Sequence, residues 1–421
     1  MPAMRDLLSS LWPRTRGEVQ RPAHKVGLVL PGGGARAAYQ VGVLKAVSEM
    51  LPKEVGNPFS ILSGTSAGAV NSAVLASNAP RFRAGVGELE RVWRNFHVAQ
   101  VYRSDALTML GSSLRWLMAM VTGGLLISFP QSLLNNHPLR ALLKKNVRFD
   151  RIQAAIESGC LEALAVTAAG YTSAHSITFF QGRAGLRNWE RARREGRREE
   201  ITLDHLMASV AAPFIFPPTL IRHQYFGDGA MRQTAPLSAA IHLGAERLLV
   251  VGTRNEVPVR PTADTPVVEP TFGHIAGFVL DTLFMDGLYV DLERLNRINL
   301  LVDHATGASP DKADAKLKRV ECMVMTPSVD IREIAEKHSD SLPWPVRMLL
   351  KGVGVTKKGG GRLLSFLLFE RAFTCELIRL GYGDAMKRKE HLVPFLAGES
   401  IDLLDAPPEV VLGLSGEEDG A

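Results

Sequence analysis

The chain has 421 residues, which is enough for one large domain with appendages or for two domains. Hydrophobic residues make up 46% and charged residues 22% of it, an ordinary globular composition that excludes a mostly disordered chain. The formal net charge of +6 mildly favours anionic surfaces such as membrane lipids or nucleic acid, but it does not decide between partners.

Targeting and redox signals are sparse. The three cysteines, Cys160, Cys322 and Cys375, are odd in number and far apart, so we expect buried thiols in a reducing compartment. In the first 23 residues a short apolar run is followed by Arg14, Arg16 and Arg21, and the order of a signal peptide, with charges, then a longer apolar stretch, then a small-residue cleavage site, is absent. We therefore expect an N-terminal tail and a cytoplasmic protein that is peripheral at a membrane at most. Leu117–Pro130 is too short to span a bilayer and is expected to be a buried helix, with a membrane-touching flap as the alternative.

The N-terminal elements alternate between strand and helix. Lys25–Leu30 is a short apolar run typical of a strand buried on both faces, and Ala37–Leu51 has apolar residues at helical spacing. A second strand is predicted at Phe59–Ser63, and Ala69–Ala76 is predicted to be a buried helix. Strand, glycine turn and helix is the opening of an α/β fold.

The same alternation continues along the chain. Later strands are predicted at Ala163–Ala168, Ser176–Phe180, Leu220–Phe226, Arg247–Gly252 and Val320–Thr326, and helices at Leu203–Val210 and Leu363–Arg379. These elements predict a mostly parallel sheet with helices on both faces. Arg183–Glu200, rich in arginine and glutamate, is expected to be a solvated helix, with membrane or nucleic-acid contact as a minority alternative, and Pro258–Pro270 a loop.

Gly64-Thr65-Ser66-Ala67-Gly68 fits the pattern G-x-S-x-G between a predicted strand and a predicted helix. In that setting a strained turn exposes the serine hydroxyl, and the flanking glycines let strand and helix approach closely. The N-terminus of the following helix favours developing negative charge. We predict that Ser66 is a nucleophile, with a purely structural turn as the alternative.

Gly32-Gly33-Gly34-Ala35-Arg36-Ala37 follows the first predicted strand. Consecutive glycines can present several backbone N–H groups on one concave surface, which binds an oxyanion or a phosphate. The same residues also fit a dinucleotide-binding fingerprint, which requires an acidic residue near the end of the second strand. Glu54 precedes that strand, and the strand leads into Ser66 instead, so an oxyanion hole is the favoured interpretation.

Asp228 is the candidate base, at the end of a predicted strand in Phe226-Gly227-Asp228-Gly229-Ala230. Its flanking glycines allow close approach to another loop, although Asp-Gly alone is typical of a plain turn. Serine hydrolases ordinarily use a histidine that follows the acid in the chain. His242, His274 and His304 follow Asp228, but none has a distinctive setting, and each is expected to be a surface or packed residue.

Together these motifs resemble the patatin-like phospholipase family. The family's oxyanion loop is similar to Gly32–Ala37, its nucleophile elbow to Gly64–Gly68, and its aspartate motif to Asp228-Gly229-Ala230. A stretch that precedes the aspartate in the family is similar to Ala208-Ser209 followed by Pro213, Phe216 and Pro217. The resemblance covers Val26 to Pro236, and beyond it only Gly381-Tyr382-Gly383-Asp384-Ala385 resembles a pattern of many bacterial members.

The resemblance implies a three-layer α/β/α sandwich and a dyad of Ser66 and Asp228 that hydrolyses acyl esters of lipids without a histidine, a metal or another cofactor. It implies that Gly32, Gly33 and Gly34 form the oxyanion hole and that Arg36 braces this loop or adds charge. Gly64 and Gly68 flank the elbow. A partly apolar pocket should raise the pKa of Asp228, because an aspartate is otherwise a weak base.

The expected organisation is a tail over 1–23, a catalytic core over 24–240, a continuation of the core with a largely helical region over 241–400, and a flexible tail over 401–421. The expected partners are a lipid or phospholipid substrate and a membrane surface contacted through Leu117–Leu126 or Arg183–Arg198, without nucleic acid. The sequence does not indicate an oligomeric state. The alternatives are a non-catalytic lipid- or protein-binding member of the same fold, which the intact motifs disfavour, and a nucleotide-binding α/β domain.

Overall fold

The structure is a computed structural model of the chain. It describes residues 24–399 except 104–131 (of which 111, 118 and 122 are placed), 255–268, 284–286, 309–317, 353 and 356–359. The predictions for both tails and for Leu117–Pro130, and most of Pro258–Pro270, lie outside the described residues.

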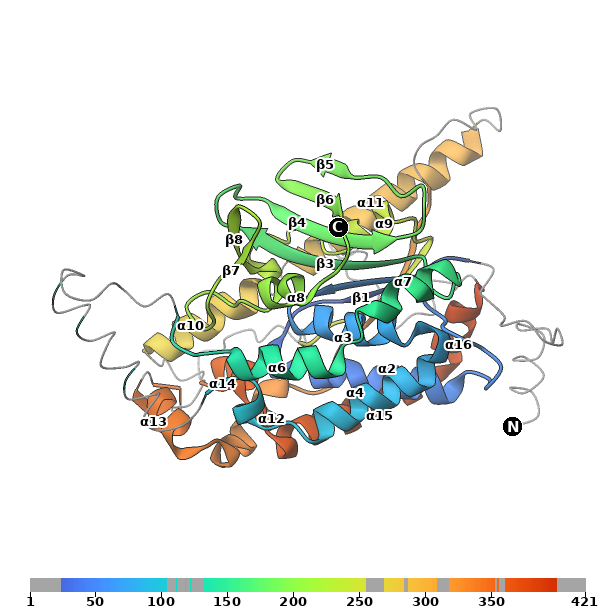
Figure 1. Cartoon of the computed structure of the whole chain (residues 1–421). Helices are drawn as coiled ribbons and strands as arrows, with labels where there is room; N and C mark the ends of the chain where they lie inside the picture. Colours follow the sequence, from blue (N-terminus) through green and yellow to red (C-terminus); the bar gives the residue numbers. More distant parts are fainter. Residues whose placement is uncertain are drawn as a thin grey trace, which may run out of the picture.

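One sheet runs through the described part of the chain in the order β10-β9-β1-β2-β3-β4-β6-β5, and β8 pairs with β3 and β7 with β8 (Figure 1). From β10 to β3 the neighbouring strands are parallel, whereas β4 and β8 are antiparallel to β3. The strands are β1 (Val26–Leu30), β2 (Ile61–Thr65), β3 (Ala163–Gly170), β4 (Ser176–Gly182), β5 (Trp189–Arg191), β6 (Arg194–Arg198), β7 (Thr219–Ile221), β8 (Gln224–Asp228), β9 (Arg247–Val251) and β10 (Glu321–Met325).

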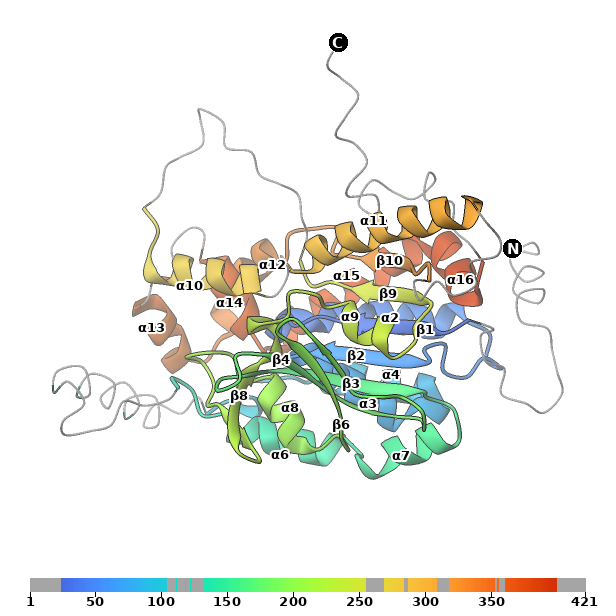
Figure 2. The same cartoon turned by 90° about the horizontal axis from the view of Figure 1, so that it is seen from above.

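Helices cover both faces of this sheet and bury two apolar clusters. The larger cluster lies under α2, α3, α4 and α15, and the smaller one lies on the opposite face under α9 and α11 (Figures 1 and 2). The predicted three-layer α/β/α fold with a mostly parallel central sheet is therefore confirmed. The helices are α2 (Ala38–Met50), α3 (Ala67–Ser77), α4 (Phe82–Arg94), α6 (His137–Asn146), α7 (Asp150–Glu157), α8 (Leu203–Ser209), α9 (Ser238–His242), α10 (Phe272–Asp281), α11 (Gly287–Ala308), α12 (Ile331–Lys337), α13 (Trp344–Gly352), α14 (Gly361–Leu367), α15 (Arg371–Lys387) and α16 (Lys389–Ala397).

Strands β1, β2 and β9 are completely buried because parallel strands are covered by helices on both faces. Their carboxyl ends lie at one edge of the sheet, where the loop after β1 and the turn after β2 come together. Open α/β sheets characteristically carry their ligand sites at this edge. The sheet therefore places Gly32–Gly34 beside Ser66.

Helix α15 crosses α2 at two glycines. A Cβ atom on Gly42 of α2 would lie 2.1 Å from the carbonyl oxygen of Ile378, and one on Gly381 of α15 would lie 2.2 Å from the carbonyl oxygen of Tyr39. The two backbones therefore approach too closely for any side chain at either position. The C-terminal pattern around Gly381 thus has a packing role against the first helix.

The helix predicted over Arg183–Glu200 is wrong, since this segment contains the hairpin of β5 and β6. The charged residues of this segment, which suggested a helix, form ion pairs within one strand instead. Arg197, for example, contacts Glu195 at 2.6 Å. The indole of Trp189 covers Gly196, where a Cβ atom would lie 2.2 Å from the ring. Packing of the Trp189 ring over Gly196 favours the strand pairing of β5 with β6, and charged side chains are typical of the exposed edge of a sheet.

Two smaller predictions also need correction. The strand predicted over Leu220–Phe226 is two strands, because Arg222 takes a left-handed conformation (φ 53°) and the chain turns back on itself. The helix predicted over Leu363–Arg379 is divided between α14 and α15. Among the described residues, no helix combines the length and the apolar character needed to cross a bilayer.

Candidate active site

Ser66 occupies the turn between β2 and α3 with φ 54° and ψ −128°. A non-glycine residue in this region of backbone space is strained, and such strain concentrates at functional sites. The glycines around it are required by close contacts. A Cβ atom on Gly68 would lie 2.0 Å from the carbonyl oxygen of Leu30, and one on Gly64 would lie 2.5 Å from the Cα of Ala69. The turn therefore holds α3 tightly against the end of β1.

Ser209 fixes the backbone of the turn and was not assigned a role from the sequence. The backbone N–H of Ser66 donates to the Ser209 hydroxyl at 2.9 Å, and that hydroxyl donates to the carbonyl oxygen of Thr167 at 2.7 Å. Ser209 is completely buried. One hydroxyl thus connects α8, β3 and the strained turn. Its position in the Ala-Ser stretch was the only signal in the sequence.

Asp228 is the last residue of β8 and pairs with Ala168 of β3. Its N–H donates to the carbonyl oxygen of Ala211 at 2.8 Å, and its Oδ1 accepts the N–H of Ala230 at 3.0 Å. Its Oδ2 is buried and has no partner of normal hydrogen-bond geometry among the described residues. A Cβ atom on Gly229 would lie 2.2 Å from the carbonyl oxygen of Thr167, so this glycine lets the aspartate turn pack against β3.

The carboxyl group of Asp228 is only 1% exposed. Burial outweighs the opposing hydrogen bonds from the Ser66 side chain and the Ala230 amide, and the net effect raises its pKa to about 7. The turns that carry Ser66 and Asp228 adjoin, since a Cβ atom on Gly229 would lie 2.9 Å from the Cγ2 of Thr65, and Oδ2 of Asp228 has no fully formed hydrogen bond among the described residues. Catalytic hydrogen bonds are often long without substrate. A carboxylate with this pKa can accept a proton near neutral pH.

The glycine loop lies between β9 and α14. Gly34 has φ 55°, and a Cβ atom there would lie 2.4 Å from the carbonyl oxygen of Phe366. At Gly33 the backbone φ is extended (169°), which any residue can adopt, so the backbone conformation alone does not require glycine there. Glycine is needed at Gly33 because a Cβ atom would lie 2.5 Å from the Oγ1 of Thr253. The Thr253 hydroxyl itself donates to the carbonyl oxygen of Gly32 at 3.0 Å.

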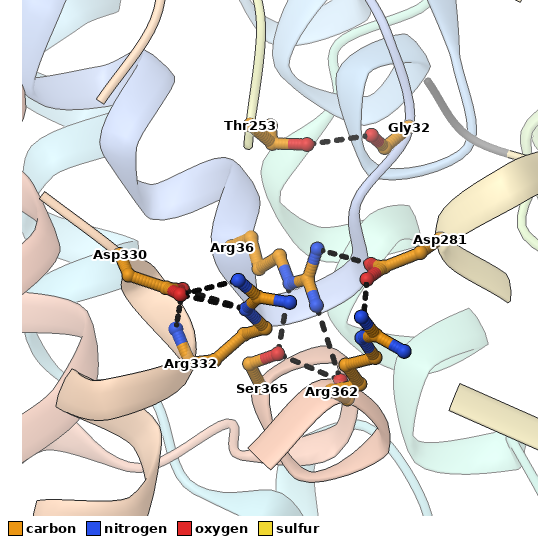
Figure 3. Close-up of polar contacts among 8 residues, drawn as sticks. All are labelled: Gly32, Arg36, Thr253, Asp281, Asp330, Arg332, Arg362 and Ser365. Atoms are coloured by element: carbon orange, nitrogen blue, oxygen red, sulfur yellow. Dashed lines mark hydrogen bonds and ion pairs between the residues drawn. The ribbon is translucent and has the colours of Figure 1, made fainter. Parts of the chain in front are cut away.

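Arg36 is 2% exposed and turns its guanidinium toward α10 and α14 (Figure 3). It donates to Asp281 at 2.7 Å, to the Ser365 hydroxyl at 2.8 Å and to the carbonyl oxygen of Arg362 at 3.1 Å. Of the two roles considered for this residue, the geometry favours bracing the loop over adding charge to an oxyanion.

An apolar pocket adjoins the two motifs. Ser66 and Gly34 both border it, and nearly all of its remaining lining is hydrophobic. The side chains come from α3, α4, α6, α10 and α14, and include Val70, Val74, Leu89, Val92, Leu139, Leu142, Leu143, Leu280, Phe366 and Leu367. Such a lining suits a hydrocarbon chain whose polar end lies at Ser66.

The three histidines considered as bases lie elsewhere. His242 stacks on Trp189 with ring centroids 5.0 Å apart, His274 belongs to the first turn of α10, and His304 is exposed on α11. In the described ranges no histidine is hydrogen bonded to Ser66 or Asp228. The same ranges hold no group of three His, Cys, Asp or Glu side chains arranged to bind a metal ion.

A strained serine between a buried strand and a helix, beside a glycine loop, defines an α/β protein with a nucleophile elbow. The family model described as patatin-like phospholipase matches residues 28–241, which is more than half of the chain. The chain belongs to the patatin-like phospholipase family.

Individual relatives are similar over shorter spans. Lysophospholipase nte1 of Aspergillus terreus (strain NIH 2624 / FGSC A1156) is 40% identical over 90 residues, and that of Aspergillus oryzae (strain ATCC 42149 / RIB 40) is 38% identical over 90 residues. Each match covers 19% of this chain and 6% of the relative, so the chain spans only a small part of these proteins.

Two solved structures have a similar arrangement. Human GIVD cytosolic phospholipase A2 gives a TM-score of 0.44 at 12% identity, over 94% of this chain and 63% of that chain. VipD from Legionella pneumophila gives a TM-score of 0.36 at 12% identity, over 91% of this chain and 72% of that chain. Both likenesses are too distant for a functional comparison.

The burial of Asp228 generates a prediction about stability. Because its folded pKa of about 7 lies above its ordinary value of 3.8, its ionisation opposes folding as pH rises through about 7. The loss of stability develops between pH 3.8 and about pH 7, so Asp228→Asn should raise the Tm at about pH 8.5 and change it little at about pH 3, in thermal unfolding scans.

Asp330→Asn is the matched control. The pKa of Asp330 is lowered, because hydrogen bonds and the charge of Arg332 outweigh the effect of burial. Its carboxylate therefore adds stability above its ordinary pKa, and the asparagine variant should have a lower Tm at neutral pH. Equal effects of the two substitutions at about pH 8.5 would contradict the raised pKa of Asp228.

Proposed function

We propose that the chain is a lipid acyl hydrolase that cleaves carboxylic esters of phospholipids or lysophospholipids by a dyad of Ser66 and Asp228. One observation carries this proposal: a strained serine lies beside a desolvated aspartate at an apolar pocket that the glycine loop also borders. Family membership and the partial likeness to two fungal lysophospholipases support it.

In the first half of the reaction the Ser66 oxygen attacks the ester carbonyl carbon, and Asp228 takes the hydroxyl proton as general base. The carbonyl oxygen becomes an oxyanion, which the N–H groups of Gly33 and Gly34 stabilise. Collapse of this intermediate breaks the bond to the alcohol oxygen. The departing alcohol receives the proton from Asp228, and the acyl group remains on Ser66.

In the second half a water molecule attacks the acyl-enzyme and gives its proton to Asp228. The second tetrahedral intermediate uses the same N–H groups. Its collapse releases the fatty acid and returns the proton to Ser66. The apolar lining from α3, α4 and α6 holds the acyl chain during both halves, so binding energy from the chain orients the ester.

In this proposal the lipid surface approaches the end of the molecule that carries α10 and α13. These two helices lie at the left end in both views (Figures 1 and 2). Phe278 and Ile275 of α10 and Trp344 and Met348 of α13 are each more than half exposed. Helix α13 contains no acidic residue and adds Lys351 and Arg347, of which Arg347 pairs with Asp340 at 3.2 Å; basic residues beside an apolar face are typical of helices that lie in a membrane interface. Leu280 of α10 borders the pocket, which joins this surface to the acyl site.

The arginine hairpin of β5 and β6 is the weaker of the membrane candidates. Arg197 pairs with Glu195, and Arg198 donates to the carbonyl oxygens of Gly182, Arg183 and Leu186. Internal partners reduce the charge available to lipid headgroups. The hairpin also lies at the far edge of the sheet, beyond β4.

Removing the nucleophile should abolish turnover. Ser66→Ala should hydrolyse a phospholipid and a soluble p-nitrophenyl ester at less than about a tenth of the wild-type rate and should lose labelling by a fluorophosphonate probe. Asp228→Asn should lower kcat similarly, because the shape is kept and the base is lost. His242→Ala is the control and should keep most of the activity. A histidine as essential as Ser66 would show that the dyad mechanism is wrong.

The glycine loop separates an oxyanion hole from a nucleotide site. Gly33→Ala forces its Cβ into Thr253 and should lower kcat about a hundredfold, with little change in KM, because the oxyanion contact forms in the transition state. Thermal scans with ATP or NAD should show no stabilisation of the wild type. A clear nucleotide-dependent rise in Tm, together with unchanged esterase turnover of Gly33→Ala, would favour the nucleotide-binding alternative.

Vesicle flotation tests the proposed lipid-facing surface. The double variant Phe278→Ser, Trp344→Ser should lose most vesicle binding and keep its activity on a soluble ester, because the pocket lining is unchanged. Leu301→Ser, which removes an equally exposed apolar side chain on α11, should bind like the wild type. Equal loss in the control would contradict the assignment to α10 and α13. Identical binding to neutral and anionic vesicles would exclude the arginine hairpin.

A further inference from the structure

The guanidinium of Arg36 connects the glycine loop to parts of the chain far along the sequence. Arg36 belongs to the short 3-10 helix η1 (Gly34–Ala37) that completes the loop, and its backbone N–H donates to the carbonyl oxygen of Gly33 at 3.1 Å. Its side chain reaches Asp281 at the end of α10 and Ser365 of α14, and it lies over the ring of Phe366 at 3.9 Å (Figure 3). The Nε, Nη1 and Nη2 atoms of Arg36 therefore each donate a hydrogen bond to α10 or α14.

Asp281 supplies the negative charge that this arrangement requires. It is 3% exposed, and its two oxygens face Arg36 at 2.7 Å and Arg362 at 3.5 Å. Burial lowers the pKa of Arg36, and Asp281 opposes that shift by its charge and its hydrogen bond. A further cation, Arg332, lies nearby, but it is already paired with Asp330. Without Asp281, a buried positive charge would be left uncompensated.

Helix α14, which hydrogen bonds to the Arg36 side chain, also limits the space around the glycine loop. The carbonyl oxygen of Phe366 lies against Gly34, and Thr253 confines the loop from its other side at Gly32 and Gly33. The loop is therefore clamped between the end of β9 and α14. Arg36 and Asp281 are the charged pair of this clamp, and Gly34 borders the pocket that contains Ser66.

We propose that Asp281 is a positioning residue for the oxyanion hole: through Arg36 it fixes the orientation of the Gly33 and Gly34 N–H groups. The proposal rests on the proposed hydrolase function and extends the site beyond residue 241, where the family match ends. Oxyanion donors act only when they are held in place before the reaction, so a loose loop lowers kcat without changing how the acyl chain binds.

The test measures kcat and KM of the full chain on a soluble p-nitrophenyl ester. Asp281→Asn keeps the shape and removes the charge, and should lower kcat by about tenfold or more while KM stays within about twofold. The rise of activity with pH should keep its midpoint near 7, because Asp228 is untouched. A general loss of structure would also lower the apparent kcat at unchanged KM by reducing the amount of active enzyme, so kcat is expressed per active site titrated with a fluorophosphonate probe, and the Tm is measured alongside.

Glu321→Gln is the matched control at the opposite edge of the sheet. Glu321 pairs at 3.0 Å with Arg247, which is 6% exposed on its side chain and lies 5.4 Å from the ring of Phe395. This pair therefore reproduces the buried arginine, its anion and its aromatic neighbour outside the site. The control, whose carboxylate side chain is 22% exposed against 5% for Asp281, should lose some stability and keep kcat within about twofold.

Two further variants complete the design. If Asp281→Asn does not fold, Ser365→Ala removes one hydrogen bond from Arg36 and keeps the charged pair, and should lower kcat about threefold to fivefold.

A double-mutant cycle that combines Asp281→Asn with Arg36→Gln should be non-additive, because both residues act through one loop. Multiplicative losses, or a kcat for Asp281→Asn no lower than that of Glu321→Gln, would overturn the proposal. Failure of the hydrolase function is a separate result: no ester turnover that depends on Ser66.

Discussion

The desolvation of one carboxyl group is the condition on which the proposed chemistry depends. Asp228 is kept from water by the antiparallel pairing of β8 with β3 and by the close approach that Gly229 permits. Its raised pKa makes an aspartate competent as a base near neutral pH, a role that a histidine fills in most serine hydrolases. In the proposed dyad, burial of the aspartate takes the place of an imidazole. The strained turn at Ser66 and the buried carboxylate both reduce stability locally and are maintained by the packing around them.

A chain of buried amides maintains that packing. The side-chain amide of Gln40 donates to the carbonyl oxygens of Pro31 and Val251, which end β1 and β9. Asn71 of α3 donates to Gln40 at 3.0 Å, and the indole of Trp93 donates to Asn71 at 2.9 Å. Five elements (α2, α3, α4 and the ends of β1 and β9) are fixed relative to one another by three side chains with satisfied hydrogen bonds. Buried polar networks of this kind favour one arrangement of the core over alternatives.

Local motifs were predictable from the sequence because their geometry is encoded within a few residues. The strand, the glycine turn and the helix around Ser66 form one continuous segment, and apolar runs identify the buried strands. The hairpin of β5 and β6 was not predictable, since its choice of strand over helix depends on the cover of Trp189 over Gly196. Thr253, Asp281 and Ser365 gave no signal either. Each is an ordinary residue type whose role comes from contact with a loop more than 200 positions earlier.

The crossing of α2 and α15 at Gly42 and Gly381 has a consequence for synthesis of the protein. The first helix after the glycine loop buries its small-residue face only against a helix made more than 300 residues later. A ribosome releases the segment that carries Ser66 and Asp228 long before its final packing partner exists. The nascent chain must therefore wait with an incomplete apolar core, a state that exposes it to aggregation and to chaperones. The turn that carries Ser66 therefore reaches its final packing late, after the C-terminal helix α15 has been made and has packed on α2.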